Sequence, residues 1–467
     1  MSDASPETLT PQPLTPPPLT PTGHMRAIAV LGLPLILSHV AQFSISLTDA
    51  LMLGWYDVTA LAAQVLAGMV FFVLFLFGSG FAWAVMPMVA EAESGGQSQQ
   101  VRRVTRMAMW LSILFGALSM PLMIWSEPLL LALGQTGEIA REASRYLAVA
   151  GWGIFPALLV MVLKSYLAAL ERTQVVLWVT IGAVLVNVIV NYALIFGNWG
   201  APELGIVGAA WASVSVHFVS LGLLAVYAGV VTREHALFIR FWRPDWEAFG
   251  QVFRLGWPIG ITTLAEVGLF AAASIMMGWL GTLPLAAHGI ALQIASLVFM
   301  IHLGLGNVAT VRAGRALGVQ DWGGLRLGAQ VVVALSLGLA ALTVVAFLLV
   351  PEVLMGLFLS PDEPDRAGVI AIGVVLLAAA ALFQLADAAQ VMALSLLRGV
   401  QDTRVPMIIA TLSYWAVGMP VAYVMGFVLG WGGVGVWLGL AVGLAGAGLF
   451  MMLRFWGVIL PRLTAQA

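Results

Sequence analysis

Long apolar stretches alternate with short polar breaks along this chain from residue 26 onward. A transmembrane helix needs about 20 mainly apolar residues, and each of these stretches reaches that length. They lie near residues 28–52, 60–88, 105–125, 144–169, 175–197, 206–230, 254–279, 285–309, 327–350, 368–396, 406–429 and 434–456. The pattern therefore predicts an all-α, polytopic membrane protein with twelve transmembrane helices.

Composition agrees with this interpretation and leaves no room for a soluble domain. Hydrophobic residues make up 61% of the 467 residues and charged residues 9%, whereas soluble domains carry about 25% charged residues. The net charge of −2 gives no reason to expect nucleic-acid binding. The absence of cysteine excludes disulfides and thiol chemistry, and it fits a bacterial inner-membrane protein.

The segment 1–25 differs in kind from the rest of the chain. Leu-Thr-Pro recurs at 9–11, 14–16 and 19–21, and this part of the chain has neither an apolar core nor a basic start. A signal peptide needs both features. We expect residues 1–25 to form a disordered, Pro/Thr-rich cytoplasmic tail.

Basic residues fall mainly on one side of the predicted spans, which sets the orientation. Sixteen of the 20 Lys and Arg residues lie in one alternating set of connections. This set is therefore expected to be cytoplasmic, with both termini on that side. Lys164 lies inside a span and is expected to extend its ammonium group to the cytoplasmic face.

The second half of the chain repeats the first at a constant offset. Leu31-Gly32-Leu33-Pro34 matches Leu255-Gly256-Trp257-Pro258, and Met52, Gly54 and Trp55 match Met276, Gly278 and Trp279. Six spans per half is an even number, so the halves should be parallel repeats around a central cavity. We expect six-helix bundles at 26–231 and 254–467. The linker, 232–253, is expected to carry a short interfacial helix containing Trp242, Trp246, Phe249 and Phe253.

Three carboxylates stand alone inside long apolar stretches: Asp49, Glu266 and Asp387. An ionisable group at membrane depth costs about 3 kcal/mol or more and usually lines an ion or substrate path. The alternative is a neutral carboxylate that simply joins helices. In the repeat, Glu266 aligns with Gln42 and His288 aligns with Gln64, so the halves carry different polar groups.

Several motifs resemble the multidrug and toxic compound extrusion (MATE) transporters, and in particular their NorM-type branch. They are Thr48-Asp49 to Gly54, Glu266 to Phe270, Ala286 to Ala291, and Asp387 to Val391 followed by Leu397-Arg398-Gly399. The resemblance covers everything after the tail. It implies a two-lobed cavity that exports organic cations in exchange for Na⁺ or H⁺ by alternating access.

The same resemblance implies two cation-coupling sites. Asp49 would join Asn187 and Asn191, which lie four apart on one helix face, and Glu266 would pair with Asp387. Na⁺ could bind at either set, because carboxylate and amide oxygens are hard ligands. Related proteins often have Tyr where this chain has Phe383, which favours a proton over Na⁺ in the second half. The residues expected at the substrate cavity are Gln42, Gln64, His288, Phe383 and Gln384.

Other functions fit the sequence less well. No nucleophile–base or metal-ligand motif suggests an enzyme, and no phosphate-binding loop suggests ATP as the energy source. A lipid-linked saccharide flippase of related architecture is the main alternative, but its diphosphate cargo calls for embedded basic residues. We expect a monomeric antiporter without a cofactor, whose partners are cationic small molecules and the lipid bilayer.

Overall fold

A computed structural model describes residues 20–361 and 363–465, and these residues form helices and connecting turns without strands. Twelve helical segments are long and apolar enough to cross a membrane. The predicted all-α fold with twelve spans is therefore confirmed. The helices are α1 Pro21–Tyr56, α2 Val58–Ser94, α3 Ser98–Ile124, α4 Ser126–Ala132, α5 Gly137–Ala169, α6 Thr173–Phe196, η1 Asn198–Gly200, α7 Ile206–Val231, η2 Arg233–His235, α8 Trp246–Trp279, α9 Thr282–Gly318, α10 Trp322–Leu349, α11 Pro351–Gly356, α12 Arg366–Gly399, α13 Arg404–Thr411, η3 Leu412–Gly418, α14 Met419–Tyr423, η4 Val424–Val428, α15 Gly432–Arg454, η5 Phe455–Ile459 and α16 Leu460–Ala465.

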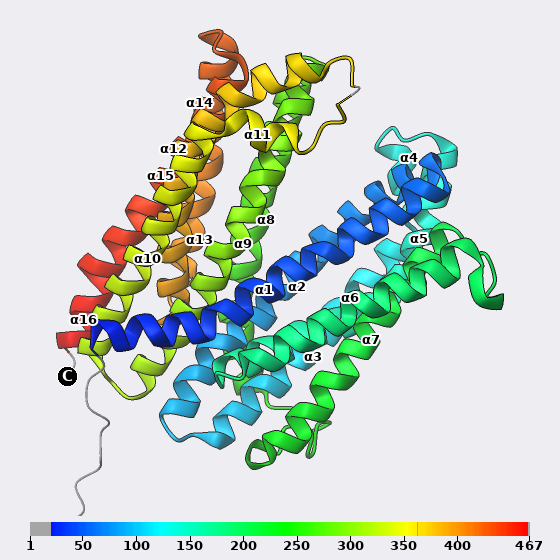
Figure 1. Cartoon of the computed structure of the whole chain (residues 1–467). Coiled ribbons are helices and arrows are strands. Elements are labelled where there is room, and N and C mark those ends of the chain that lie inside the picture. Colours follow the sequence, from blue (N-terminus) through cyan, green and yellow to red (C-terminus); the bar gives the residue numbers. More distant parts are fainter. Residues whose placement is uncertain (1–19, 362, 466–467) are drawn as a thin grey trace, which may run out of the picture.

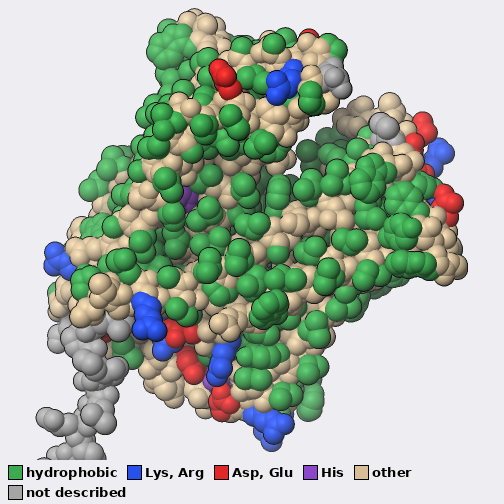
Figure 2. Space-filling model, in the orientation of Figure 1, with side chains coloured by type: hydrophobic (Ala, Val, Ile, Leu, Met, Phe, Trp, Pro, Cys, Tyr) green, Lys and Arg blue, Asp and Glu red, His purple; other side chains and the backbone are tan. Residues whose placement is uncertain are grey.

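The helices form two halves that meet at one end and diverge towards the other (Figure 1). The N-terminal half comprises α1 to α7 and the C-terminal half α8 to α16. We call the end where they meet the basic end, because Arg103, Arg254, Arg315, Arg404 and Arg454 lie there. We call the opposite end the far end. Figure 2 shows a groove between the halves that opens towards the far end, and a largely uncharged band across the middle of the face in view.

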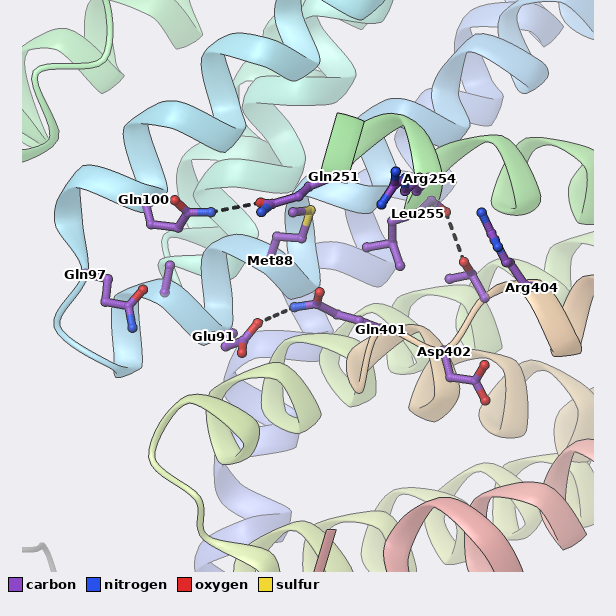
Figure 3. A pocket seen from close by; sticks show the side chains of 12 residues that line it. Met88, Glu91, Gln97, Gln100, Gln251, Arg254, Leu255, Gln401, Asp402 and Arg404 are labelled. Carbon is purple, nitrogen blue, oxygen red and sulfur yellow. Dashed lines mark hydrogen bonds between the residues drawn. The ribbon is translucent and has the colours of Figure 1, made fainter. Parts of the chain in front are cut away.

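Polar contacts join the halves at the basic end. Gln401, after α12, donates from its side-chain amide to Glu91 of α2, and Gln100 of α3 donates to Gln251 of α8 at 3.2 Å (Figure 3). Arg315 of α9 forms an ion pair with Glu171, after α5, at 2.9 Å. These contacts hold the two halves together at this end.

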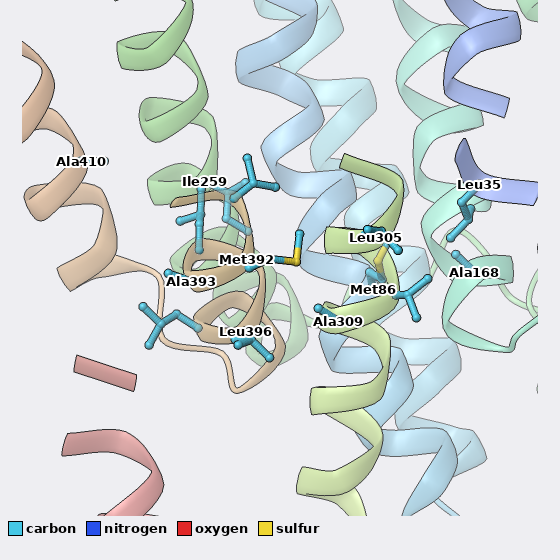
Figure 4. Packing of buried hydrophobic residues seen from close by; sticks show 14 of the residues in the cluster. Leu35, Met86, Ala168, Ile259, Leu305, Ala309, Met392, Ala393, Leu396 and Ala410 are labelled. Carbon is cyan, nitrogen blue, oxygen red and sulfur yellow. The ribbon is translucent and has the colours of Figure 1, made fainter. Parts of the chain in front are cut away.

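Buried hydrophobic residues of both halves pack together in one shared core (Figure 4). It contains Leu35 and Met86 from the N-terminal half together with Ile259, Leu305 and Met392 from the C-terminal half. A second buried cluster, which includes Met52, Leu53 and Ile154, belongs to the N-terminal half alone. The halves thus share one core near the basic end and have separate interiors further along.

The first helix of each half crosses onto the other half. Residues early in α1 contact α9: Ile36 lies against Gly304, and His39 is hydrogen-bonded to Asn307 at 3.0 Å. Asp49, later in α1, contacts α6 and α7 of its own half. In the same way α8 begins against α2, where Gly256 lies against Gly80, and ends against α15, where Met277 lies against Gly433. Each crossing helix therefore belongs partly to both halves.

Glycine permits both crossings, at positions related by the repeat. A Cβ atom on Gly80 would lie 2.6 Å from the backbone of Gly256 and Gly260. Gly304 is the counterpart of Gly80 in the second half, and its Cβ would lie 3.0 Å from the Cα of Ile36. Side chains at these positions would force the helices apart. The sequence repeat is therefore a structural repeat of parallel halves.

Two predicted boundaries differ from the structure. The first helix begins at Pro21, not after residue 25, because Thr20 accepts a hydrogen bond from the Gly23 amide at 3.2 Å and proline suits a first helical turn. The remainder of the predicted tail, residues 1–19, lies outside the described residues. The linker forms turns and the short η2, and it contains no separate interfacial helix. Trp246, Phe249 and Phe253 belong instead to the first turns of α8.

Asp245 explains why α8 starts so early. Its carboxylate caps the helix by accepting a hydrogen bond from the Ala248 amide at 3.1 Å, and it binds the Arg103 guanidinium at 2.5 Å. The hydrogen-bonded guanidinium holds the pKa of Asp245 below its ordinary value of 3.8. Capping and the ion pair together fix the start of α8 against α3.

Candidate functional site

The N-terminal site surrounds Asp49, which is 5% exposed. Asn187 and Asn191, one turn apart on α6, donate their side-chain amides to Asp49 Oδ1 at 2.8 and 2.6 Å. Ser213 of α7 donates to Asp49 Oδ2 at 3.2 Å. The structure thus brings together all three residues predicted for this site and adds Ser213.

The amide oxygens of this site remain available as acceptors or ligands. Both Asn187 Oδ1 and Asn191 Oδ1 are buried and have no hydrogen-bond partner among the described residues. Buried polar atoms are nearly always paired, so exceptions call for a functional explanation. Two unpaired amide oxygens beside a carboxylate form an oxygen-rich cluster suited to a hard cation.

The C-terminal site contains Glu266 of α8 and Asp387 of α12. Asp387 is 1% exposed, and neither of its carboxylate oxygens has a hydrogen-bond partner among the described residues. Glu266 Oε1 is likewise buried and unpaired. The two acids lie close enough to interact electrostatically with each other and with Tyr414. The predicted pair is therefore brought together, but without the amide partners that Asp49 has.

Tyr414 supplies a hydroxyl group to the C-terminal site. It comes from the π-helical segment η3, is fully buried, and lies beside Gln390. Phe383, which lacks a hydroxyl, packs its ring against Phe270 and Trp437 instead. π-Helical turns re-aim side chains and are frequent at functional sites.

Three of the five residues predicted for the substrate cavity are almost fully buried. His288, Phe383 and Gln384 are each 3% exposed or less, inside the C-terminal half. Both ring nitrogens of His288 are occupied, because Trp437 donates to Nδ1 at 3.1 Å and Ser274 Oγ lies 3.0 Å from Nε2. His288 is thus a hydrogen-bonded packing residue.

The other two predicted cavity residues, Gln42 and Gln64, are exposed and half-buried respectively. The sequence position of Lys164, on α5, suggested that its ammonium group would reach the basic face, but it does not. It donates to Gln42 Oε1 at 3.2 Å. His39 and His217 lie near the same ammonium group. Lys164 is held there because Gln42, two turns before Asp49 on α1, offers it an acceptor at membrane depth.

A metal site built from histidine and acidic residues is not part of this arrangement. No group of three or more His, Asp or Glu side chains gathers within residues 20–361 and 363–465. The donor atoms around Asp49 and Asp387 are oxygens, which are hard ligands.

Comparison with known proteins assigns the family. The MatE family model matches residues 34–193 and 258–424, one segment in each half. The chain belongs to the MATE family. MATE proteins are transporters, so this chain is not an enzyme.

Curated relatives of this MATE protein cover nearly its whole length. It is 48% identical over 438 residues to a probable multidrug resistance protein NorM of Rhizobium meliloti, covering 93% of this chain and 94% of the relative. It is 45% identical to the protein of the same name from Agrobacterium fabrum, covering 92% and 93%. The predicted resemblance to the NorM-type branch is confirmed.

Solved MATE structures share the fold at lower sequence identity. A MATE transporter in complex with MaL6 superimposes with a TM-score of 0.85 at 19% identity, covering 95% of this chain and 97% of that one. The eukaryotic transporter AtDTX14 superimposes with a TM-score of 0.82 at 17% identity, covering 96% and 98%. The MATE fold therefore extends over the described chain.

Four side chains of this MATE protein were missed as site residues by sequence reasoning: Ser213, Tyr146, Tyr414 and Arg398. Tyr146, 6% exposed, lies beside Asp49 and Gln64. Arg398 belongs to the motif Leu397-Arg398-Gly399, and its guanidinium lies 5.4 Å from the ring centre of Trp83 and near Glu266. The tyrosines could have been identified as candidate site residues, because they are polar groups inside predicted spans. Ser213 could not, because the spans contain many serines.

Proposed function

We propose that this MATE protein is a multidrug efflux antiporter that exports cationic organic compounds in exchange for Na⁺ or H⁺. The observation that carries the proposal is the pair of acidic sites at membrane depth, one in each half. Among the described residues, the buried amide oxygens of Asn187 and Asn191 in the first site and both carboxylate oxygens of Asp387 in the second have no hydrogen-bond partner. Oxygens with a purely structural role would be hydrogen-bonded.

The basic end is proposed to face the cytoplasm, because membrane proteins retain Lys and Arg on that side. The described arrangement then closes the cytoplasmic end and opens the groove outward. Export would require the opposite arrangement in turn, with the contacts between Arg315 and Glu171 broken.

Na⁺ is the proposed coupling ion, with protons competing at the same carboxylates. Asp49, Asn187 and Asn191 offer at most four side-chain oxygens, so backbone or water oxygens would complete the shell around Na⁺. One charge moving down a potential of 100 mV supplies about 2.3 kcal/mol, enough for between one and two decades of substrate gradient. The NorM name of the relatives supports efflux of drugs as the task that this energy serves.

The structure adds one basic residue inside the spans, Arg398, as a flippase would need. This residue gives the flippase alternative little support. Arg398 lies near Glu266, which offsets its charge, and its face is occupied by Trp83. A diphosphate would need exposed positive charge in the groove. The multidrug names of relatives that are nearly half identical also favour efflux.

Flux measurements in proteoliposomes test the proposal. Na⁺ and pH gradients are imposed separately, and the efflux of an organic cation is followed together with the ion. We expect efflux that falls when external Na⁺ is replaced by choline at fixed pH. Unchanged efflux after that replacement, with collapse when the pH gradient is dissipated, would make the protein a proton antiporter. No ion-dependent transport at all would refute antiport.

A further inference from the structure

A cavity of about 780 Å³ lies between the two halves at the basic end. Its walls come from α2 and α3 of the N-terminal half and from α8 and the α12–α13 connection of the C-terminal half (Figure 3). It is far from Glu266, which lies more than three turns further along α8 than Arg254, about 18 Å of helix. The proposed transport of a cation through the groove does not explain the role of this cavity.

The acidic side chains that line the cavity have polar partners, whereas its arginines have none among the residues that the structure describes. Its two carboxylates are engaged: Glu91 accepts a hydrogen bond from Gln401, and Asp402 forms an ion pair with Arg454 at 2.5 Å. Its two guanidinium groups, Arg254 and Arg404, are exposed and have neither a hydrogen bond nor an ion pair among the described residues. The free charge in the cavity is therefore positive.

Two unpaired arginines in one cavity favour a particular ligand chemistry. The guanidinium group is a planar, permanently charged fork that binds phosphate through two parallel hydrogen bonds. Gln97 and Gln251 also line the cavity and carry amide donors. A volume of about 780 Å³ is within the range of small-molecule sites. We propose that this cavity binds a phosphate-bearing anion through Arg254 and Arg404.

The ligand could come from the headgroup of an anionic phospholipid in the adjoining leaflet or from a soluble phosphate in the cytoplasm. Both sources present the same group to the arginines, and the proposed orientation places both on this side. The two sources differ in whether a bilayer is required, which an experiment can separate.

Occupancy would bias the conformation. Both halves contribute walls, so the site exists only while the basic end is closed. A ligand that binds only one state raises the ratio of that state to the other by a factor of 1 + [L]/Kd, or about elevenfold at ten times Kd. Saturating ligand should therefore slow export, a consequence that rests on the proposed function, whereas binding itself does not.

Thermal unfolding of the full-length protein tests binding without transport. One arm adds inorganic phosphate to protein in detergent. The other compares nanodiscs of phosphatidylcholine alone with nanodiscs containing phosphatidylglycerol. The variant is Arg254→Gln/Arg404→Gln, and the control is Arg233→Gln/Arg462→Gln, which removes two exposed charges elsewhere. We expect a rise of several degrees in at least one arm for wild type and control, and none for the cavity variant.

The arm that responds identifies the source. Equal shifts in all three proteins would show a general ionic effect and overturn the proposal, as would no shift in either arm. If the double variant unfolds on purification, Arg254→Lys/Arg404→Lys keeps the charge but loses the fork and should bind more weakly. Spin labels on Arg172→Cys and Gln320→Cys, in a chain without native cysteine, should report a narrower and shorter distance with ligand. This distance measurement does not depend on transport, so it tests the binding proposal even if the proposed function is wrong.

Discussion

At the scale of single residues, the two acidic sites differ in how completely their atoms are paired. Asp49 receives hydrogen bonds from three side chains, whereas Asp387 receives none from the described residues. An anionic carboxylate without donors is strongly disfavoured at membrane depth. The C-terminal site is thus suited to binding a proton or a cation, and the N-terminal site to holding a negative charge.

The acids of the C-terminal site should be essential. Glu266→Gln and Asp387→Asn keep size and remove the ionisable group, so each should insert normally and lose coupled export by tenfold or more, about 1.4 kcal/mol or more in coupling. Drug resistance and ion flux at matched expression measure this. Glu352→Gln, an acid at the far end, is the control. Full resistance in both amide variants would contradict the assignment.

The N-terminal site should behave as one unit, since Asn187 and Asn191 bind the same carboxylate oxygen. Asp49→Asn and Asn187→Ala should each impair export. The double variant should be little worse than the worse single variant, because residues in direct contact are not additive. Transport rates of all four proteins give the comparison. Strictly additive losses, or no loss for Asn187→Ala, would favour a role in helix packing.

The resemblance to MATE transporters predicted that Asp49 joins Asn187 and Asn191, and the spacing of the two amides predicted that they share a helix face. The sequence could not place Tyr414, because only the π-helical turn of η3 directs that side chain inward. Nor could it place Lys164, whose partner Gln42 lies far away in the chain, on α1. Local periodicity specifies faces, while long-range partners depend on how the helices pack.

At the scale of helices, the two crossings depend on backbones that approach closely at glycine. The repeat of the two halves was visible in sequence, and with it their parallel arrangement. The crossings were not visible, because glycine is frequent throughout the spans. The early start of α8 was missed as well, since residues 246–253 lack the continuous apolar run that marks a span.

Alanine at a crossing should destabilise the closed basic end. Gly80→Ala places a Cβ 2.6 Å from backbone atoms, which cannot move as a side chain can, and should cost about 1–3 kcal/mol. Gly182→Ala and Gly338→Ala are matched helical controls with no atom within 4 Å of the new Cβ. Thermal unfolding in detergent compares them. A Gly80→Ala protein as stable as the controls would show that the helices do not approach as described.

The start of α8 should show acid sensitivity through Asp245. Its pKa is lowered by Arg103, so the ion pair adds stability that is fully present above the ordinary value of 3.8 and is lost as the pH falls through the lowered pKa. Asp245→Asn keeps a helix cap but loses the charge. Its unfolding temperature should be below that of wild type at neutral pH, and the difference should vanish in acid. A difference that is independent of pH would argue against the ion pair.

At the scale of the whole molecule, the halves share a core at the basic end and have separate interiors beyond it. The molecule is therefore closed at the basic end, which we call the joint, and has a groove that opens at the far end. Transport by alternating access then requires the joint to open, and the ion pair between Glu171 and Arg315 offers a place to block it.

A covalent bridge across the joint should stop export. Glu171→Cys/Arg315→Cys, joined by a short cleavable bifunctional thiol reagent, should transport before linkage, stop after it and recover on cleavage. Glu142→Cys/Arg145→Cys, an ion pair within α5, is the control and should transport throughout. Radiolabelled substrate uptake into inverted vesicles provides the measurement. Export that persists in the fully linked protein would show that this end need not open.

The crossing of α1 has a consequence for how the protein is made. His39 lies on α1, and its partner Asn307 is 268 residues later in the chain. Translation at about 5–20 residues per second delivers that partner roughly 10–50 s after His39. During that interval the start of α1 faces lipid or the insertion machinery instead of α9. The N-terminal half therefore completes its packing only after much of the C-terminal half has been synthesised, so the two halves mature together.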